Sequence, residues 1–119
     1  MIEARCHCGA ITVRVPRLPA HLIDCNCSLC RKNGAWWALY PAGEIEVIAR
    51  PEALGAYVWG PRSIRTLHCQ VCSATTHWLP LVATAGAQGG VNARHVDPAL
   101  LAGIPRRRFD GATSWTYLD

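Results

Sequence analysis

The segment Cys69-Gln70-Val71-Cys72 carries two cysteines separated by two residues. A C-x-x-C turn points both sulfurs to one side, at a separation that a tetrahedral metal ion can bridge, and such a pair usually works with a second pair. Cys6 and Cys8 supply that second pair, because alternate residues of an extended strand face the same way. The sequence therefore predicts a closed four-sulfur site that ties the start of the chain to its middle.

Three further cysteines lie between these pairs, at Cys25, Cys27 and Cys30. They offer three thiolates in a C-x-C-x-x-C pattern and leave no cysteine to complete a tetrahedron. Three protein ligands and one exchangeable ligand distinguish catalytic zinc from structural zinc. The fourth ligand stays undecided between a water molecule and one of four side chains: Asp24, His7, His68 and His77.

The cysteine count and the composition favour metal binding in a folded, cytoplasmic domain. Seven cysteines cannot all pair in disulfides, and the first residues show no apolar segment typical of a signal peptide. Hydrophobic residues make up 50% of the chain and charged residues 17%, which excludes a disordered protein. The longest mostly apolar stretch, residues 78–87, is about half as long as a membrane span. We therefore expect one domain over residues 1–119 that holds two zinc ions and has no membrane partner.

The basic excess is too small to indicate a nucleic-acid partner. The formal charge is +4, and thiolates that hold two zinc ions would reduce it to about +1. The only basic run is Arg106-Arg107-Arg108, which we expect in a solvated loop.

The apolar pattern predicts a mainly β fold assembled from antiparallel hairpins. Strands are expected over residues 10–15, 21–23, 77–81 and 90–93, and two hairpins are expected to pair 36–40 with 44–48 and 56–59 with 63–68. One helical turn is expected over residues 28–32, with Ser28 as its N-cap and Asn33-Gly34 as its end. A second short turn is expected near the C-terminus, over residues 98–102.

Taken together, the cysteine motifs resemble those of the glutathione-dependent formaldehyde-activating enzyme family, also called the centromere protein V family. C-x-C-G at residues 6–9, C-x-C-S-x-C-R at 25–31 and C-x-x-C at 69–72 occur in the order and spacing of that family. Asn92-Ala93-Arg94 and Asp97 also look like its C-terminal half. Two positions depart from the pattern, because Asn26 stands where many members have histidine and Ser73 stands where the C-x-x-C is usually followed by glycine.

The resemblance implies an Mss4-like arrangement of twisted antiparallel hairpins stapled by zinc. It also implies a structural zinc on Cys6, Cys8, Cys69 and Cys72, and a second zinc on catalytic Cys25, Cys27 and Cys30 near a glutathione site. The implied activity is that of a carbon-sulfur lyase, which handles the adduct of a thiol with formaldehyde or another small aldehyde. Glutathione would be the co-substrate.

Two cations follow the three-cysteine group directly. Arg31 and Lys32 are candidates to bind the carboxylates of glutathione, and Arg94 is a weaker candidate for the same task. Arg31 and Lys32 would equally stabilise the unpaired carbonyls at the end of a helical turn. His68 and His77 are candidates to donate hydrogen bonds to a sulfur, and the five tryptophans are expected to fill the core.

The alternative function is a non-enzymatic zinc module for contact with protein or nucleic acid. The fold does not separate the two functions, because one fold hosts many activities. A histidine or carboxylate in the fourth position of the three-cysteine group favours the module, whereas an exchangeable ligand there favours the enzyme. Either function is compatible with a homo-oligomer.

Overall fold

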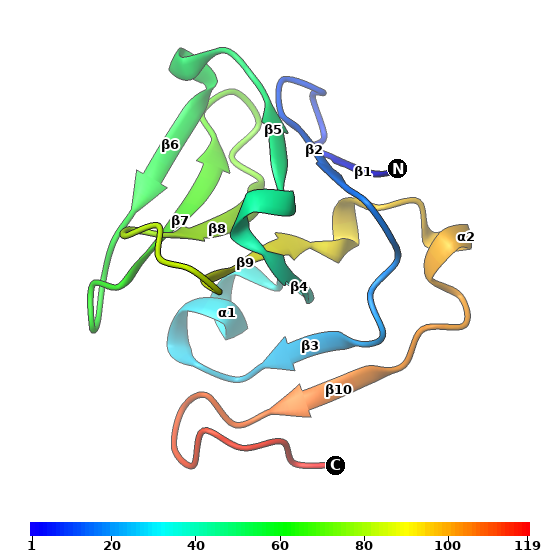
Figure 1. The fold of residues 1–119 in the computed structure, drawn as a ribbon, viewed down its shortest axis with the longest axis vertical. Coiled ribbons are helices and arrows are strands. Elements are labelled where there is room, and N and C mark those ends of the chain that lie inside the picture. Colours follow the sequence, from blue (N-terminus) through cyan, green and yellow to red (C-terminus); the bar gives the residue numbers. More distant parts are fainter.

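The strands form two sheets, shown in Figure 1. A three-stranded sheet has the order β1-β2-β5, and a seven-stranded sheet has the order β10-β3-β4-β9-β8-β7-β6. The computed structural model describes all residues, 1–119. The strands are β1 (Ile2–Arg5), β2 (Thr12–Val15), β3 (Leu22–Cys25), β4 (Trp37–Pro41), β5 (Glu46–Ile48), β6 (Leu54–Tyr57), β7 (Ile64–Cys69), β8 (Thr75–Pro80), β9 (Gln88–Asn92) and β10 (Arg106–Phe109).

The helices are short, which confirms a mainly β fold. The two α-helices are α1 (Ser28–Asn33) and α2 (Pro98–Leu101), and three single turns of 3-10 helix are η1 (Ala42–Glu44), η2 (Pro51–Ala53) and η3 (Ala93–His95). No helix has the length and apolar character needed to cross a membrane. The strand predicted over residues 10–15 is β2, the one over 21–23 is β3, and those over 77–81 and 90–93 are β8 and β9.

The small sheet shows the alternation that the sequence predicts. Ala4, Val13 and Val15 are buried on its inner face. On its outer face Arg14 lies between Glu3 and Glu46, with an ion pair of 2.6 Å to Glu3 and a longer contact of 3.8 Å to Glu46. Because these three side chains are exposed, they contribute little to the free energy of unfolding.

The hairpin predicted from residues 36–40 and 44–48 is wrong. β4 pairs with β3 and β9 in the large sheet, whereas β5 pairs with β2 in the small one. Between them, η1 turns the chain away from the large sheet instead of reversing it as a tight hairpin would. The alternating pattern of β5 fits either partner, because a period of two specifies which face is buried but does not specify the neighbouring strand. The other predicted hairpin is confirmed as the antiparallel pair β6 and β7.

The basic run near the C-terminus forms a strand, so its prediction as a loop is wrong. β10 pairs in parallel with β3, and Phe109 lies opposite Cys25 (Figure 1). This is the one parallel pair beside the antiparallel pairs that we expected. Along β10 exposed and half-buried residues alternate, and Arg107 and Phe109 are the half-buried ones. The sequence does not show this alternation, because three successive arginines have the same hydrophobicity.

The buried residues form two groups. The main core contains thirteen buried residues and includes Cys6 and Cys69. A separate small core contains Ile23, Cys25, Ala35 and Trp37, and Phe109 and Tyr117 pack against it. Each cysteine group therefore belongs to a different core.

Candidate functional site

The first cysteine cluster brings together Cys6, Cys8, Cys69 and Cys72, as the spacing predicts. All four sulfurs lie within 4.8 Å of one another, with the Cys8 sulfur 3.8 Å from that of Cys6 and 3.6 Å from that of Cys69. The C-x-C pair lies in a turn after β1, not on a strand, so that part of the prediction is wrong. The turn brings the sulfurs of Cys6 and Cys8 together as the expected strand would have.

Backbone N–H groups point at the sulfurs of this cluster. Ile11 donates to Cys6 Sγ at 3.3 Å, and Val71 and Cys72 donate to Cys69 Sγ at 3.4 and 3.5 Å. Backbone N–H groups of Ala74 and Cys8 lower the pKa of the Cys72 thiol to about 6. Such donors stabilise thiolates, which are the form of cysteine that binds zinc. The donor set and its surroundings therefore fit a four-coordinate zinc ion.

The second cluster brings together Cys25, Cys27 and Cys30 within the same limit of 4.8 Å. Cys25 ends β3, and Cys30 lies inside α1. The N-cap of α1 is Cys27 and not Ser28, because the Cys27 sulfur accepts the backbone N–H of Cys30 at 3.3 Å. The first turn of the helix thus fixes one sulfur, and the predicted end at Gly34 is confirmed by its left-handed conformation.

The three thiols of this cluster differ in how readily they lose a proton. A hydrogen bond from Cys30, together with the backbone N–H groups of Cys27 and Gly111, lowers the pKa of Cys25 to about 6. The neighbouring Cys25 sulfur and burial raise the pKa of Cys30. The indole N–H of Trp37 opposes that rise, because it donates to Cys30 Sγ at 3.2 Å. Three sulfurs with such donors fit a zinc ion held by three protein ligands.

Trp37 is a site residue that the sequence analysis missed. We expected all five tryptophans to fill the core; Trp37 does so at 5% exposed, but Trp115 is 71% exposed, so the expectation is wrong for Trp115. The indole N–H of Trp37 also donates a hydrogen bond to the sulfur of Cys30, seven positions earlier in the chain. No local spacing in the sequence signals this contact, because it depends on how β4 folds back beside α1.

No histidine, aspartate or glutamate joins the three sulfurs. None of the four side chains considered as a fourth ligand therefore lies in the group. His77, which we expected near a sulfur, is only 1% exposed and instead contacts Thr76 Oγ1 at 2.7 Å. His68 lies against Gly55 on the neighbouring strand β6. The prediction that either histidine donates to a sulfur is wrong.

The loop after β10 covers the second cluster. A Cβ atom at Gly111 would lie 2.5 Å from Cys25 Sγ and 3.5 Å from the indole of Trp115. Asn26 anchors this loop, because its side chain donates to Asp110 at 3.1 Å and accepts from the backbone of Ala112 at 3.0 Å. Asn26, one of the two residues that depart from the family pattern, thus connects the cysteine segment to the C-terminal segment.

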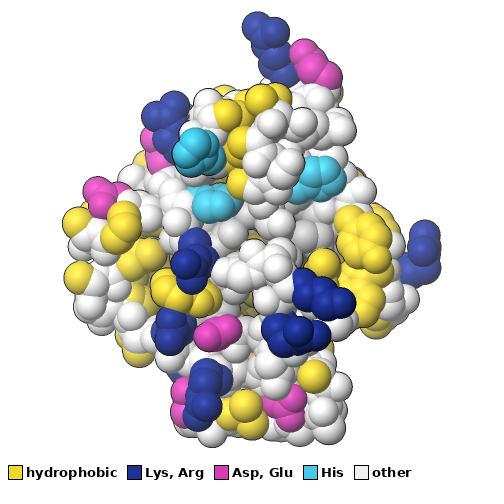
Figure 2. Space-filling model, turned by 180° about the vertical axis from the view of Figure 1, so that it is seen from behind, with side chains coloured by type: hydrophobic (Ala, Val, Ile, Leu, Met, Phe, Trp, Pro, Cys, Tyr) yellow, Lys and Arg dark blue, Asp and Glu magenta, His cyan; other side chains and the backbone are white.

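Arg31 and Lys32 lie exposed in the last turn of α1. Neither side chain makes an ion pair within the protein. Whether they bind the carboxylates of a thiol stays a prediction. On the face seen in Figure 2, basic side chains are interspersed with acidic ones and do not form a continuous stripe.

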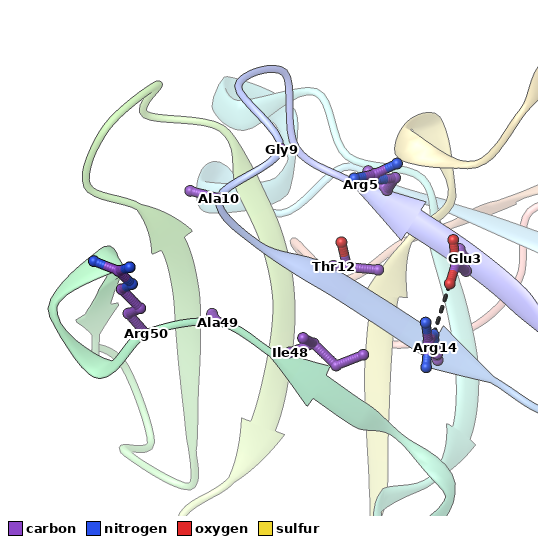
Figure 3. A pocket seen from close by; sticks show the side chains of 9 residues that line it. All are labelled: Glu3, Arg5, Gly9, Ala10, Thr12, Arg14, Ile48, Ala49 and Arg50. Carbon is purple, nitrogen blue, oxygen red and sulfur yellow. Dashed lines mark hydrogen bonds and ion pairs between the residues drawn. The ribbon is translucent and has the colours of Figure 1, made fainter.

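A groove of about 580 Å³ lies on the outer face of the small sheet (Figure 3). Arg5 and Arg50 border it, with the Thr12 hydroxyl between them. None of its lining residues comes from β3 or α1. This groove is therefore separate from the second cluster.

Two comparisons with known proteins agree with this geometry. A family model described as glutathione-dependent formaldehyde-activating enzyme matches residues 1–85. A crystal structure of a structural genomics protein from Rhodobacter sphaeroides is 30% identical in sequence, with a TM-score of 0.71. The similarity covers 88% of this chain and 99% of that chain.

Proposed function

This chain belongs to the glutathione-dependent formaldehyde-activating enzyme family, and we propose that it forms and splits the adduct of a thiol with a small aldehyde. The thiol is glutathione or a similar one, and the aldehyde is formaldehyde or a close relative. In the forward direction the sulfur bonds to the carbonyl carbon, the C=O electron pair moves to oxygen, and the proton of the thiol ends on that oxygen. The reverse direction breaks the C–S bond, which is the reaction of a carbon-sulfur lyase.

The observation that supports this proposal is the group of three sulfurs that no fourth protein ligand joins. A zinc ion bound there would lower the pKa of a thiol that coordinates it, so that a thiolate exists at neutral pH. A non-enzymatic module needs no exchangeable position, and a fourth side chain would serve it better. The chemistry of the second cluster therefore favours the enzyme.

The residues around the second cluster hold its sulfurs in place. Trp37 fixes Cys30 through its N–H, and the first turn of α1 fixes Cys27. Trp37 also excludes water from the inner side of the cluster, since it is almost fully buried. Arg31 and Lys32 remain available to bind a carboxylate of glutathione, because the protein provides neither with an acidic partner.

The proposal includes two zinc ions per chain, one in each cluster. Elemental analysis of protein purified without chelator measures that number. We expect two ions in the wild type and one in Cys27→Ser. A single ion in the wild type, retained by Cys27→Ser, would remove the second site and the mechanism with it.

Exchange-resolved NMR tests the reaction. With glutathione and formaldehyde near equilibrium, the exchange rate between free and S-hydroxymethyl thiol should rise in proportion to wild-type protein and stay at the uncatalysed rate with Cys27→Ser. Other thiols and aldehydes are run beside this pair. Equal rates with wild type and Cys27→Ser for every pair would contradict the enzyme and leave the zinc module.

A further inference from the structure

One aromatic ring beside the second cluster is exposed although the fold gains little from it. Trp115 lies in the loop after β10, and most of its surface is open to solvent. Its φ of 56° is in the left-handed region, which is uncommon for a residue with a Cβ atom and costs free energy. An exposed ring also contributes little hydrophobic stabilisation, because that stabilisation depends on burial. The stability of the fold therefore does not explain a tryptophan at this position.

Hydrogen bonds hold the loop that carries Trp115 in one conformation. The backbone N–H of Trp115 donates to the carbonyl oxygen of Asp110 at 2.7 Å. The Asp110 carboxylate accepts the backbone N–H and the hydroxyl of Ser114 at 3.1 and 2.8 Å. The Asn26 side chain connects the same carboxylate to the segment that carries the three cysteines. These contacts fix where the backbone of Trp115 lies relative to the second cluster.

The Trp115 ring lies beside the sulfur of Cys25. Gly111 leaves a small space there, because a Cβ atom at this residue would lie 2.5 Å from Cys25 Sγ and 3.5 Å from Cζ3 of the Trp115 ring. Both distances start from one point, so the edge of the ring is close to the sulfur. The ring also makes an edge-to-face contact with Phe109, with 5.1 Å between the ring centroids. Since Phe109 packs against the small core, the indole extends apolar surface from that core to the edge of the second cluster.

An exposed indole in this position favours a reactant that carries an apolar group. Its large ring gains free energy by covering aliphatic or aromatic surface and provides no charge for a carboxylate. Neither glutathione nor formaldehyde has such a group, because glutathione consists mostly of charged and amide groups and formaldehyde has only hydrogen on its carbonyl carbon. An aldehyde with an alkyl or aryl substituent carries that substituent one bond away from the carbon that joins the sulfur. The apolar group would therefore lie near the cluster, where the Trp115 ring can cover it.

From these contacts we infer that Trp115 binds the apolar substituent of the aldehyde, so that aldehydes with an aliphatic or aromatic side group are bound in preference to formaldehyde. The inference rests on the proposed function, because it assigns the aldehyde of that same reaction. The bond changes stay the same: the sulfur joins the carbonyl carbon, and the thiol proton ends on the carbonyl oxygen. The difference is a hydrophobic contact that the formaldehyde adduct cannot make.

Two thioethers that differ only in their alkyl chain test this contact without the reaction. S-methylglutathione and S-pentylglutathione resemble the adducts of formaldehyde and pentanal, and neither has a thiol proton to lose. The contribution of their shared glutathione part cancels when the two Kd values are compared. For the zinc-loaded wild type, calorimetry should give a Kd about fivefold lower for S-pentylglutathione, because the ring covers one side of its chain.

Trp115→Gly should remove this preference, so that both thioethers bind with the same Kd. Glycine adopts the left-handed conformation without strain, so the variant should stay folded and melt close to the wild-type temperature. Trp115→Phe keeps an aromatic ring and should keep part of the preference. Trp59→Gly is the matched control, because it removes another exposed tryptophan, from the turn after β6, and should leave the fivefold difference unchanged.

The exchange assay with glutathione provides a second readout. Trp115→Gly should raise the KM for pentanal about fivefold and leave the rate with formaldehyde at the wild-type value. A second copy of the chain is the other occupant that an exposed ring could have. Sedimentation equilibrium measures this, and a wild-type dimer that Trp115→Gly converts into a monomer would overturn the inference.

The outcomes separate this inference from the proposed function. If the wild type catalyses exchange with formaldehyde but binds both thioethers with equal Kd, or binds neither, the assignment of Trp115 is wrong and the function stands. If the wild type catalyses no exchange with any aldehyde, yet prefers S-pentylglutathione and loses that preference in Trp115→Gly, the apolar site stands and the proposed function is wrong.

Discussion

The two cysteine clusters differ in how far apart their cysteines lie along the chain. The first joins Cys8 and Cys69, which are 61 residues apart, and two of its members are buried in the main core. The second takes all of its sulfurs from residues 25–30 and lies in the small core. A metal ion in the first cluster closes a long loop and so stabilises the fold, whereas one in the second closes almost none. Sequence separation therefore predicts that the first cluster serves the fold and that the second is the one that exchanges a ligand.

The largest expected effect is that of Cys72→Ser compared with Cys27→Ser. Loss of a ligand in the first cluster should cost several kcal/mol of unfolding free energy, a large share of the total for a domain of this size. We expect little soluble Cys72→Ser, but folded Cys27→Ser with near-native circular dichroism. If Cys27→Ser unfolds as readily as Cys72→Ser, the clusters do not differ in the way that their sequence separation implies.

Acid should lower the free energy of unfolding because of His77, which lies in the large sheet that also carries Cys69. Burial, with Arg65 nearby, lowers the pKa of His77 to about 4 from 6.5. The unfolded chain therefore binds the proton more tightly than the folded chain does. The stability contributed by neutral His77 is complete above pH 6.5 and is lost as the pH falls from 6.5 to about 4, by up to about 3 kcal/mol.

Urea unfolding at several pH values measures this loss, with His77→Gln as the comparison. Thiolate ligands also take up protons in acid, in wild type and variant alike. The difference between the two proteins should therefore isolate His77, and the variant should show the shallower pH dependence. Parallel curves would mean that His77 does not contribute.

Gly111→Ala should weaken only the second cluster. The added Cβ would lie 2.5 Å from Cys25 Sγ, so either the sulfur or the loop must shift. Overpacking of this kind costs about 2 kcal/mol. We expect one zinc ion to be lost to a chelator at lower concentration than in the wild type, while the second ion stays.

Gly103→Ala is the control for Gly111→Ala, because its Cβ would meet nothing within 4 Å. It should keep both ions as the wild type does. Equal chelator resistance of Gly111→Ala and Gly103→Ala would show that the loop does not constrain Cys25.

The smallest expected effect is that of Trp37→Phe. This variant keeps a ring in the small core but removes the N–H that donates to Cys30, at a cost of about 1 kcal/mol. In cobalt-loaded protein the sulfur-to-metal band of the second cluster should shift. Trp59→Phe, which changes an exposed ring with no hydrogen bond, should leave the band in place. An unshifted band in Trp37→Phe would show that the N–H does not act on the sulfur.

The sequence predicts the grouping of the cysteines because that grouping depends on local spacing. The C-x-x-C and C-x-C-x-x-C patterns set how the sulfurs point, and the structure brings them together in the same four and three. The neighbours of a strand are harder to predict from the sequence, as β5 and β10 show. Alternation specifies which face is buried but does not specify the partner strand. Trp37 could not be assigned for a related reason, since it acts through one N–H whose position depends on tertiary packing.

The loop anchored by Asn26 and Asp110 lies beside the second cluster but is separate from the segment that carries its cysteines. It supplies none of the seven sulfurs, yet Gly111 lies against Cys25 and Trp115 lies beside it, 71% exposed. The family model matches residues 1–85, and this loop follows them in the chain. The residues that would hold the metal and those that border its approach can therefore be changed separately. An exchange of residues 106–119 between relatives would transplant the approach to the cluster and leave every sulfur where it is.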